Sequence, residues 1–227
     1  AHDYKVTYSY WDGAQTHSDN DNLVVQVNAG KKLAQALQQD KDLKTIYDYI
    51  NESARSSSHP ITPYIVGWAR VDATDKDNWI IEETQSDFSA TLRKQLDDLR
   101  SRGINTIDTG KKKYSLEEFG KYAKIIENLT SSWLDAAHQA VNDTAKKAGV
   151  KNILLHGPDV RANMSFGATA KKYPIWLTSM YRSYPEENNW EQINYKQYPQ
   201  PSNGTIILVQ NRPFGMNSLK CWKKKVT

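Results

Sequence analysis

Apolar and polar residues alternate in several short segments of this chain, which is the pattern of strands that bury one face. Residues 4–10 alternate in this way and residues 23–27 form an apolar run, so together they predict a hairpin with a long polar loop. A second hairpin is predicted from residues 64–71 and 78–85, which flank a short polar segment. Residues 151–156 are mostly apolar and predict a buried strand.

Between these segments, apolar residues recur at every third or fourth position, which predicts amphipathic helices. One or two helices are expected across residues 33–50. Another is expected across residues 88–99, because Ser86 or Asp87 can cap its N-terminus.

The second half of the chain continues with helices and a further hairpin. Ser115 begins a capping-box sequence and a long helix, which is expected to break near residues 128–130. Residues 157–184 are predicted to be helical in parts, and residues 190–195 and 205–209 to form a third hairpin.

This order of elements predicts an α+β protein with a central mixed or antiparallel sheet and covering helices. The Ser- and Pro-rich segment at residues 53–63 indicates a boundary. We expect an N-terminal hairpin with helices over residues 1–58, packed on an α/β core over residues 59–227 that ends in a basic tail.

Composition narrows the class of protein. The 227 residues suit one large domain, and their 38% hydrophobic content can fill a core. Without a run of about 18 apolar residues or a signal-peptide core, the chain is expected to be soluble, with no membrane partner, and either cytosolic or freed from a leader. Cys221 is the only cysteine, which excludes an intrachain disulfide and a Cys-rich zinc site. The histidines lack metal-ligand spacing, so no metal is expected.

The net charge of +4 is mild, but basic residues gather at 111–113 and at 220–225. Either run could bind phosphates, nucleic acid or an acidic surface, or could simply be a solvated loop and a frayed tail. Cys221 lies in the second run, where the basic surroundings could lower the pKa of its thiol. No His or Asn partner is placed nearby in the sequence, so Cys221 is interpreted as incidental.

Polar residues follow the strand at residues 78–85 without a break, from Glu82 to Asp87. Strand ends and helix N-termini collect ligands because backbone N–H groups are free there. Glu82 or Glu83 is the candidate general base, with Gln85 and Ser86 orienting a substrate. The alternative is plain helix capping by Ser86 or Asp87, with the glutamates facing water.

A second polar group, His156, Asp159, Arg161 and Asn163, follows the buried strand at residues 151–156. A histidine at a strand end can titrate near neutral pH or orient a carboxylate. The alternative is a loop histidine bonded to backbone. If the two strands are neighbours, both polar groups open onto one edge of the sheet. Asp87, Arg161 and Asn163 can then bind substrate together with Gln85 and Ser86.

Two stretches of the chain carry a resemblance. Residues 67–71, followed by residues 79–88 with Glu82-Glu83-Thr84-Gln85-Ser86-Asp87-Phe88, resemble a motif of phage-encoded polyvalent-protein modules in which an aromatic strand leads into Glu-Ile-Gln-Ser-Asp-Trp. Residues 128–157 resemble the second helix and strand of the same modules. The match spans about residues 64–165. It implies a bacteriophage context, in the virion or the host cytoplasm, more than a reaction.

The strand order around residues 181–190 and the final hairpin also resembles the C-terminal half of GNAT-type acyltransferases. A Glu base and a Tyr acid serve amine acylation in those enzymes, which implies Glu83 and Tyr181 in these roles. Acyl-CoA would be the cofactor, but the Gln/Arg-x-x-Gly-x-Gly/Ala loop that binds its pyrophosphate has no counterpart here. The resemblance therefore also fits a degenerate, non-catalytic relative.

Two functions from different classes follow. The first is a phage-associated, GNAT-like enzyme whose catalytic residues are Glu83, Glu82, His156 and Tyr181, and which acts on a small amine, a nucleotide or a host protein. The second is a virion or injected binding protein that engages nucleic acid or a host protein. ADP-ribosyl transfer is a weaker third, because no Arg-Ser-Glu or His-Tyr-Glu set occurs in the required order.

Overall fold

The structure is a computed structural model that describes residues 3–11, 22–55, 59, 64–166, 173–194 and 220–227, apart from the side chains of residues 163–166. Its fold is α+β, as the sequence predicts, with a seven-stranded mixed sheet in the order β1-β2-β3-β4-β7-β9-β8. The strands are β1 (Tyr4–Trp11), β2 (Asn22–Ala29), β3 (Ile65–Asp72), β4 (Asn78–Gln85), β7 (Asn152–His156), β8 (Glu191–Asn194) and β9 (Lys220–Lys225).

The chain divides into two compact units. The first comprises Ala1–Thr7, Gln26–Trp68 and Gln85–His138, and the second comprises Tyr8–Val25, Ala69–Thr84 and Gln139–Thr227. The predicted boundary near residue 58 lies beside residues outside the described ranges and stays a prediction.

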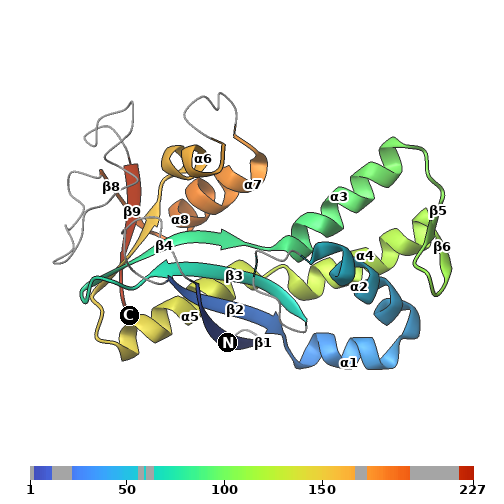
Figure 1. The fold of residues 1–227 in the computed structure, drawn as a ribbon, viewed down its shortest axis with the longest axis horizontal. Coiled ribbons are helices and arrows are strands. Elements are labelled where there is room, and N and C mark those ends of the chain that lie inside the picture. Colours follow the sequence, from blue (N-terminus) through green and yellow to red (C-terminus); the bar gives the residue numbers. More distant parts are fainter. Residues whose placement is uncertain (1–2, 12–21, 56–58, 60–63, 167–172, 195–219) are drawn as a thin grey trace. The chain divides into compact units, whose positions relative to one another are not determined.

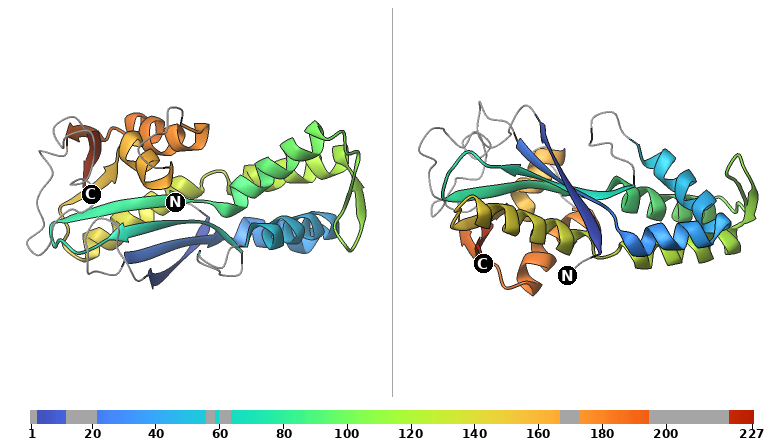
Figure 2. Two further views of the ribbon diagram at one scale, coloured as in Figure 1. Left: turned by 45° about the horizontal axis from the view of Figure 1, so that its top comes forward. Right: turned by 90° about the horizontal axis from the view of Figure 1, so that it is seen from below.

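Helices dominate the first unit (Figure 2). They are α1 (Lys31–Gln39), α2 (Lys41–Ala54), α3 (Asp87–Ser101) and α4 (Leu116–Thr130), and the small hairpin of β5 (Thr106–Asp108) and β6 (Lys113–Ser115) joins α3 to α4. Their apolar stripes form one buried cluster: Leu33, Leu37, Leu43, Ile46, Tyr47, Ile50, Phe88, Leu92, Ile107, Tyr114, Phe119, Ala123 and Ile126.

The helix boundaries follow the capping chemistry that the sequence predicts. The Ser86 hydroxyl accepts a hydrogen bond from Ser89 N at the start of α3, and the Ser115 hydroxyl accepts one from Glu118 N at the start of α4. The predicted break is confirmed, because α4 ends at Thr130 and α5 (Trp133–Lys147) begins three residues later.

The second unit contains β7, β8 and β9 with the short helices α6 (Pro158–Phe166), α7 (Ile175–Thr178), η1 (Ser179–Ser183, a π-helical turn) and α8 (Tyr184–Glu187) beside them (Figure 1). β4 pairs parallel with β7, and β9 runs antiparallel between β7 and β8. The strands before the two polar groups are therefore neighbours, which is the condition under which both groups open onto one edge of the sheet.

The predicted third hairpin is only partly testable. β8 matches its first strand, whereas residues 205–209 lie outside the described residues. β8 pairs with β9, so the basic segment for which a frayed tail was one interpretation is a strand. Its buried Cys221 and Trp222 explain why it joins the sheet despite its lysines. Within the described ranges, no helix has the length and apolar character needed to cross a membrane.

Candidate functional site

Two arginines and two glutamates of the second unit lie together near the carboxyl end of β4, and we call these four residues the ion cluster. Arg70 of β3 donates from Nη1 to Glu82 Oε2 at 2.8 Å and from Nη2 to Glu83 Oε2 at 3.1 Å. Arg161 of α6 donates from Nη2 to the other oxygen, Glu83 Oε1, at 2.8 Å. Glu83 is thus held by two guanidinium groups, and Arg70 by two carboxylates.

The ion cluster is almost entirely shielded from solvent and has no net formal charge. The side chains of Arg70, Glu82 and Arg161 are 2%, 0% and 7% exposed, and that of Glu83 is 14% exposed. Charges at such depth persist only when they are paired and hydrogen-bonded. Asn22 adds an oxygen that accepts from Arg70 Nη1 at 3.2 Å, and the ring of Trp11 lies 5.0 Å from the Arg70 guanidinium carbon.

Beyond its pairing with β7, the backbone of β4 forms hydrogen bonds with side chains. The paired positions run from Asn78 and Asn152 to Ile81 and Leu155. Past them, Arg161 Nη1 donates to the Glu82 carbonyl at 3.4 Å, and Thr84 N–H donates to the Tyr181 hydroxyl at 2.9 Å. The strand end where ligands usually bind is therefore filled by the protein's own side chains.

Tyr181 projects from η1 and is fully buried. Trp222 of β9 donates from Nε1 to the Tyr181 carbonyl at 2.8 Å, which fastens this turn to the sheet. Burial raises the pKa of the Tyr181 hydroxyl, and the nearby Arg161 opposes part of that rise. The Tyr181 hydroxyl therefore lies inside the protein, where it accepts a hydrogen bond from Thr84 N–H.

A second polar group belongs to the first unit, and we call His59, Gln85 and Asp87 the imidazole cluster. His59 Nδ1 lies 2.8 Å from Asp87 Oδ2, and Gln85 Nε2 donates to Asp87 Oδ1 at 2.6 Å. The imidazole lies 5.4 Å from the ring of Trp68 and is about a quarter exposed. A carboxylate that binds Nδ1 fixes the orientation of the imidazole ring.

The remaining predicted site residues have other positions. Ser86 is buried, and its hydroxyl donates to the Val66 carbonyl while it caps α3, so it is engaged within the protein. His156 is buried on β7 and lies in register with Cys221 of β9. Asn163 lies in α6, and its side chain is outside the described part of the structure.

Cys221 does not have the lowered pKa that its basic neighbours could have produced. Cys221 lies on β9 between β7 and β8 and is buried, and this burial raises the pKa of the thiol to about 12 against the opposing charge of Lys220. The lysines of β9 do not activate this cysteine because desolvation outweighs their charge.

Arg70 and His59 are the functional candidates that the sequence reasoning did not single out. Arg70 is the one charged residue in the apolar stretch from Gly67 to Val71, and such a residue requires a buried counter-charge. No local sequence pattern marks His59 as a candidate, because its partner Asp87 follows it by 28 residues.

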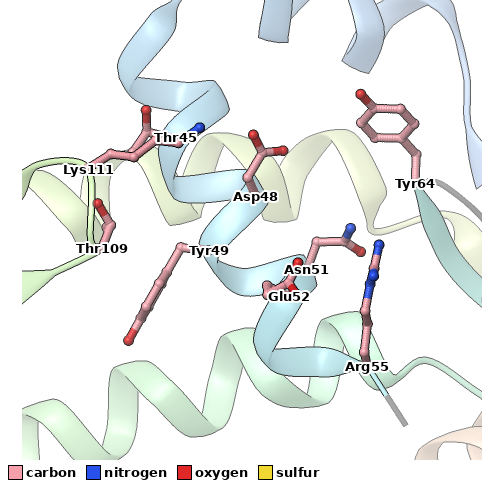
Figure 3. Close-up of a pocket in the computed structure, with 9 residues that line it drawn as sticks. All are labelled: Thr45, Asp48, Tyr49, Asn51, Glu52, Arg55, Tyr64, Thr109 and Lys111. Carbon is pink, nitrogen blue, oxygen red and sulfur yellow. The ribbon is translucent and has the colours of Figure 1, made fainter. Parts of the chain in front are cut away.

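The first unit also has an open cavity of about 480 Å³ along α2 (Figure 3). Thr109 and Lys111 border it on one side, and Tyr64 and Arg55 lie at the other end. Its two carboxylates and two cations balance, and Asp48 already pairs with Lys44 at 2.6 Å. The size suits a small ligand, but the lining does not select one.

Among the residues that the structure describes, no three His, Cys, Asp or Glu side chains are grouped to hold a metal ion. The chain matches no protein-family model, no curated protein and no solved structure.

Proposed function

We propose that this chain is a non-catalytic binding domain of GNAT-like topology from a bacteriophage context, which engages nucleic acid or a host protein in the virion or the host cytoplasm. One observation carries the proposal: both carboxylate oxygens of Glu83 are bound by buried arginines, at 2.8 Å and 3.1 Å. A general base must turn a lone pair toward its substrate, and on each Glu83 oxygen one acceptor position is already occupied by Arg70 or Arg161.

The other requirements of acyl transfer point in the same direction. The hydroxyl of Tyr181, the implied acid, is buried and bound to Thr84 N–H. The chain from β4 through α3 contains no glycine, so no backbone there can approach a pyrophosphate as closely as the GNAT loop does. The strand order, with β4 parallel to β7 and β9 between β7 and β8, supports the resemblance in topology. A degenerate, non-catalytic relative would keep the fold of these enzymes and lack a usable general base.

Thermal-shift measurements with acyl-CoA test this proposal. A cofactor at 100 times its dissociation constant stabilises the folded state by about 2.7 kcal/mol, which raises the melting temperature of a chain of this length by roughly 5–11 °C. We expect no shift with acetyl-CoA, and we expect Glu83→Gln to lower the melting temperature. An acetyl-CoA shift that disappears in Glu83→Gln, while the melting temperature without cofactor stays unchanged, would contradict the proposal.

The imidazole cluster favours a second candidate, an enzyme whose base is His59. An imidazole oriented by a carboxylate at 2.8 Å and partly open to solvent is a common arrangement for proton transfer. If this candidate holds, Asp87→Asn will reduce turnover of the substrate far more than it reduces stability. A loss confined to stability would leave the pair a structural contact at the start of α3.

A further inference from the structure

Lysines that are distant in sequence gather around the end of the chain in the second unit. Val226 N donates to the Lys151 carbonyl at 2.9 Å, and Lys225 lies in register with Asn152. Thr227 exchanges two hydrogen bonds with the Asn142 side chain of α5, at 2.9 Å and 3.2 Å. We call the exposed side chains around this point the basic surface: Lys146, Lys147, Lys151 and Lys225.

The geometry of α5 places its two lysines beside the chain end. Lys146 follows Asn142 by four residues, so the two side chains lie on one helix face one turn apart. Lys147 follows Thr144 by three residues and borders the other flank of the helix. Lysines in a last turn also suit the helix dipole, but that effect does not account for Lys151 or Lys225.

The basic surface keeps most of its charge available. In the described part of the chain, no ion pair engages Lys146, Lys147 or Lys225. Lys151 approaches Asp77 at 3.6 Å, but both side chains are well exposed and such pairs are weak. Residues 139–227 contain 13 Lys and Arg against 5 Asp and Glu, a net charge of +8 in a chain whose total is +4. Positive charge is thus concentrated in this part of the sequence.

Exposed tyrosines adjoin the same helix. Thr144 donates to the Tyr8 hydroxyl at 3.2 Å, so β1 runs past the lysine-bearing turn of α5. Tyr8 is 52% exposed, and Tyr10, two residues along the same face of β1, is 77% exposed. Rings left open beside a basic surface offer bases a place to stack.

We infer that the basic surface and these tyrosines bind single-stranded nucleic acid, with lysines on phosphates and Tyr8 and Tyr10 against bases. This inference rests on the proposed function, because it names the partner of the binding domain. Lysines that lack an apolar core around them suit a phosphate backbone better than a protein interface, which depends on buried apolar anchors. Stacking requires unpaired bases, and therefore favours a single strand over a duplex.

Fluorescence anisotropy with a labelled 20-nucleotide oligothymidylate, titrated at several salt concentrations, tests the inference. The variant Lys146→Gln/Lys147→Gln/Lys225→Gln removes three charges of the basic surface. Its matched control, Lys31→Gln/Lys32→Gln/Lys41→Gln, removes three exposed lysines of the first unit. The slope of log affinity against log salt should fall by about 2 in the first variant and stay unchanged in the control. Tyr10→Ala should weaken binding by roughly tenfold at constant slope.

Three results would overturn the inference. The first is an equal salt slope in the two triple variants, and the second is complete displacement of the oligothymidylate by polyglutamate at the same charge concentration. The third is equal affinity for a duplex together with no effect of Tyr10→Ala on binding. Polyglutamate competition would instead identify an acidic protein as the partner. Melting curves of each variant verify that it is folded. The acetyl-CoA measurement is independent, so a cofactor shift together with a lysine-dependent salt slope would reject the proposed function and keep this surface.

Discussion

Replacing Glu83 by Gln keeps the shape of the side chain and removes one charge from the ion cluster. The cluster then changes from neutral to a net charge of +1, and Arg161 loses the carboxylate that lies 2.8 Å from its Nη2. Two charge-assisted hydrogen bonds are weakened, each worth about 1.5–3 kcal/mol. Breaking a buried pair costs about 3–5 kcal/mol, and the 14% exposure of Glu83 places it at the lower end. We therefore expect a loss of about 3 kcal/mol.

Urea unfolding followed by far-UV circular dichroism measures this loss, and tryptophan fluorescence verifies that one transition is observed. A loss of 3 kcal/mol also lowers the melting temperature by roughly 6–12 °C. The matched control is Glu186→Gln, because Glu186 is an exposed glutamate of the same unit with no ion pair in the described part of the chain. If Glu83→Gln stays within about 0.5 kcal/mol of the wild type, as surface substitutions do, the carboxylate is not bound as described and the reasoning fails.

Three further changes test other parts of the structure. Cys221 should react with thiol reagents only as fast as the protein unfolds. Because burial raises the pKa of its thiol from 9.0 to about 12, stability should fall as the pH increases from 9 toward 12, by roughly 1 kcal/mol at pH 10. Cys221→Ala should abolish that part of the loss, and equal losses in both proteins would refute the reasoning. A methyl group at Gly157 would lie 2.1 Å from a backbone oxygen of β9, so Gly157→Ala should lower the free energy of unfolding by more than about 1 kcal/mol. Gly120 lies in an open helical position of α4, so Gly120→Ala should raise the free energy of unfolding by about 0.5–1 kcal/mol. Melting experiments measure both changes. Tyr181→Phe should cost about 1–3 kcal/mol because it leaves the buried Thr84 N–H without its acceptor, and unchanged stability would argue against this bond.

The fold class and most elements follow from local patterns in the sequence. Period-two alternation located β1, β3 and β4, and the capping residues Ser86 and Ser115 set the starts of α3 and α4. β9 was missed because five of its six residues are Lys or Cys, a composition typical of a solvated tail. Pairing with β7 and β8, which depends on contacts distant in sequence, decided its structure.

The sequence indicated where polar side chains gather but not how they pair. It placed Glu82 and Glu83 at the end of a strand, but pattern alone could not show that two arginines bind them. Arg70 lies on the adjacent strand, and Arg161 follows Glu83 by 78 residues. The isolated charge at Arg70 was the available indication, since a strand this apolar buries a cation only beside a carboxylate.

The central claim, that Glu83 is the partner of a buried arginine and not a free base, is tested most directly by a double-mutant cycle. Glu83→Gln, Arg161→Gln and the double variant are unfolded in urea, and the coupling free energy is obtained from the three losses of stability. Paired side chains predict a coupling of at least about 1 kcal/mol. A coupling of zero would contradict the claim.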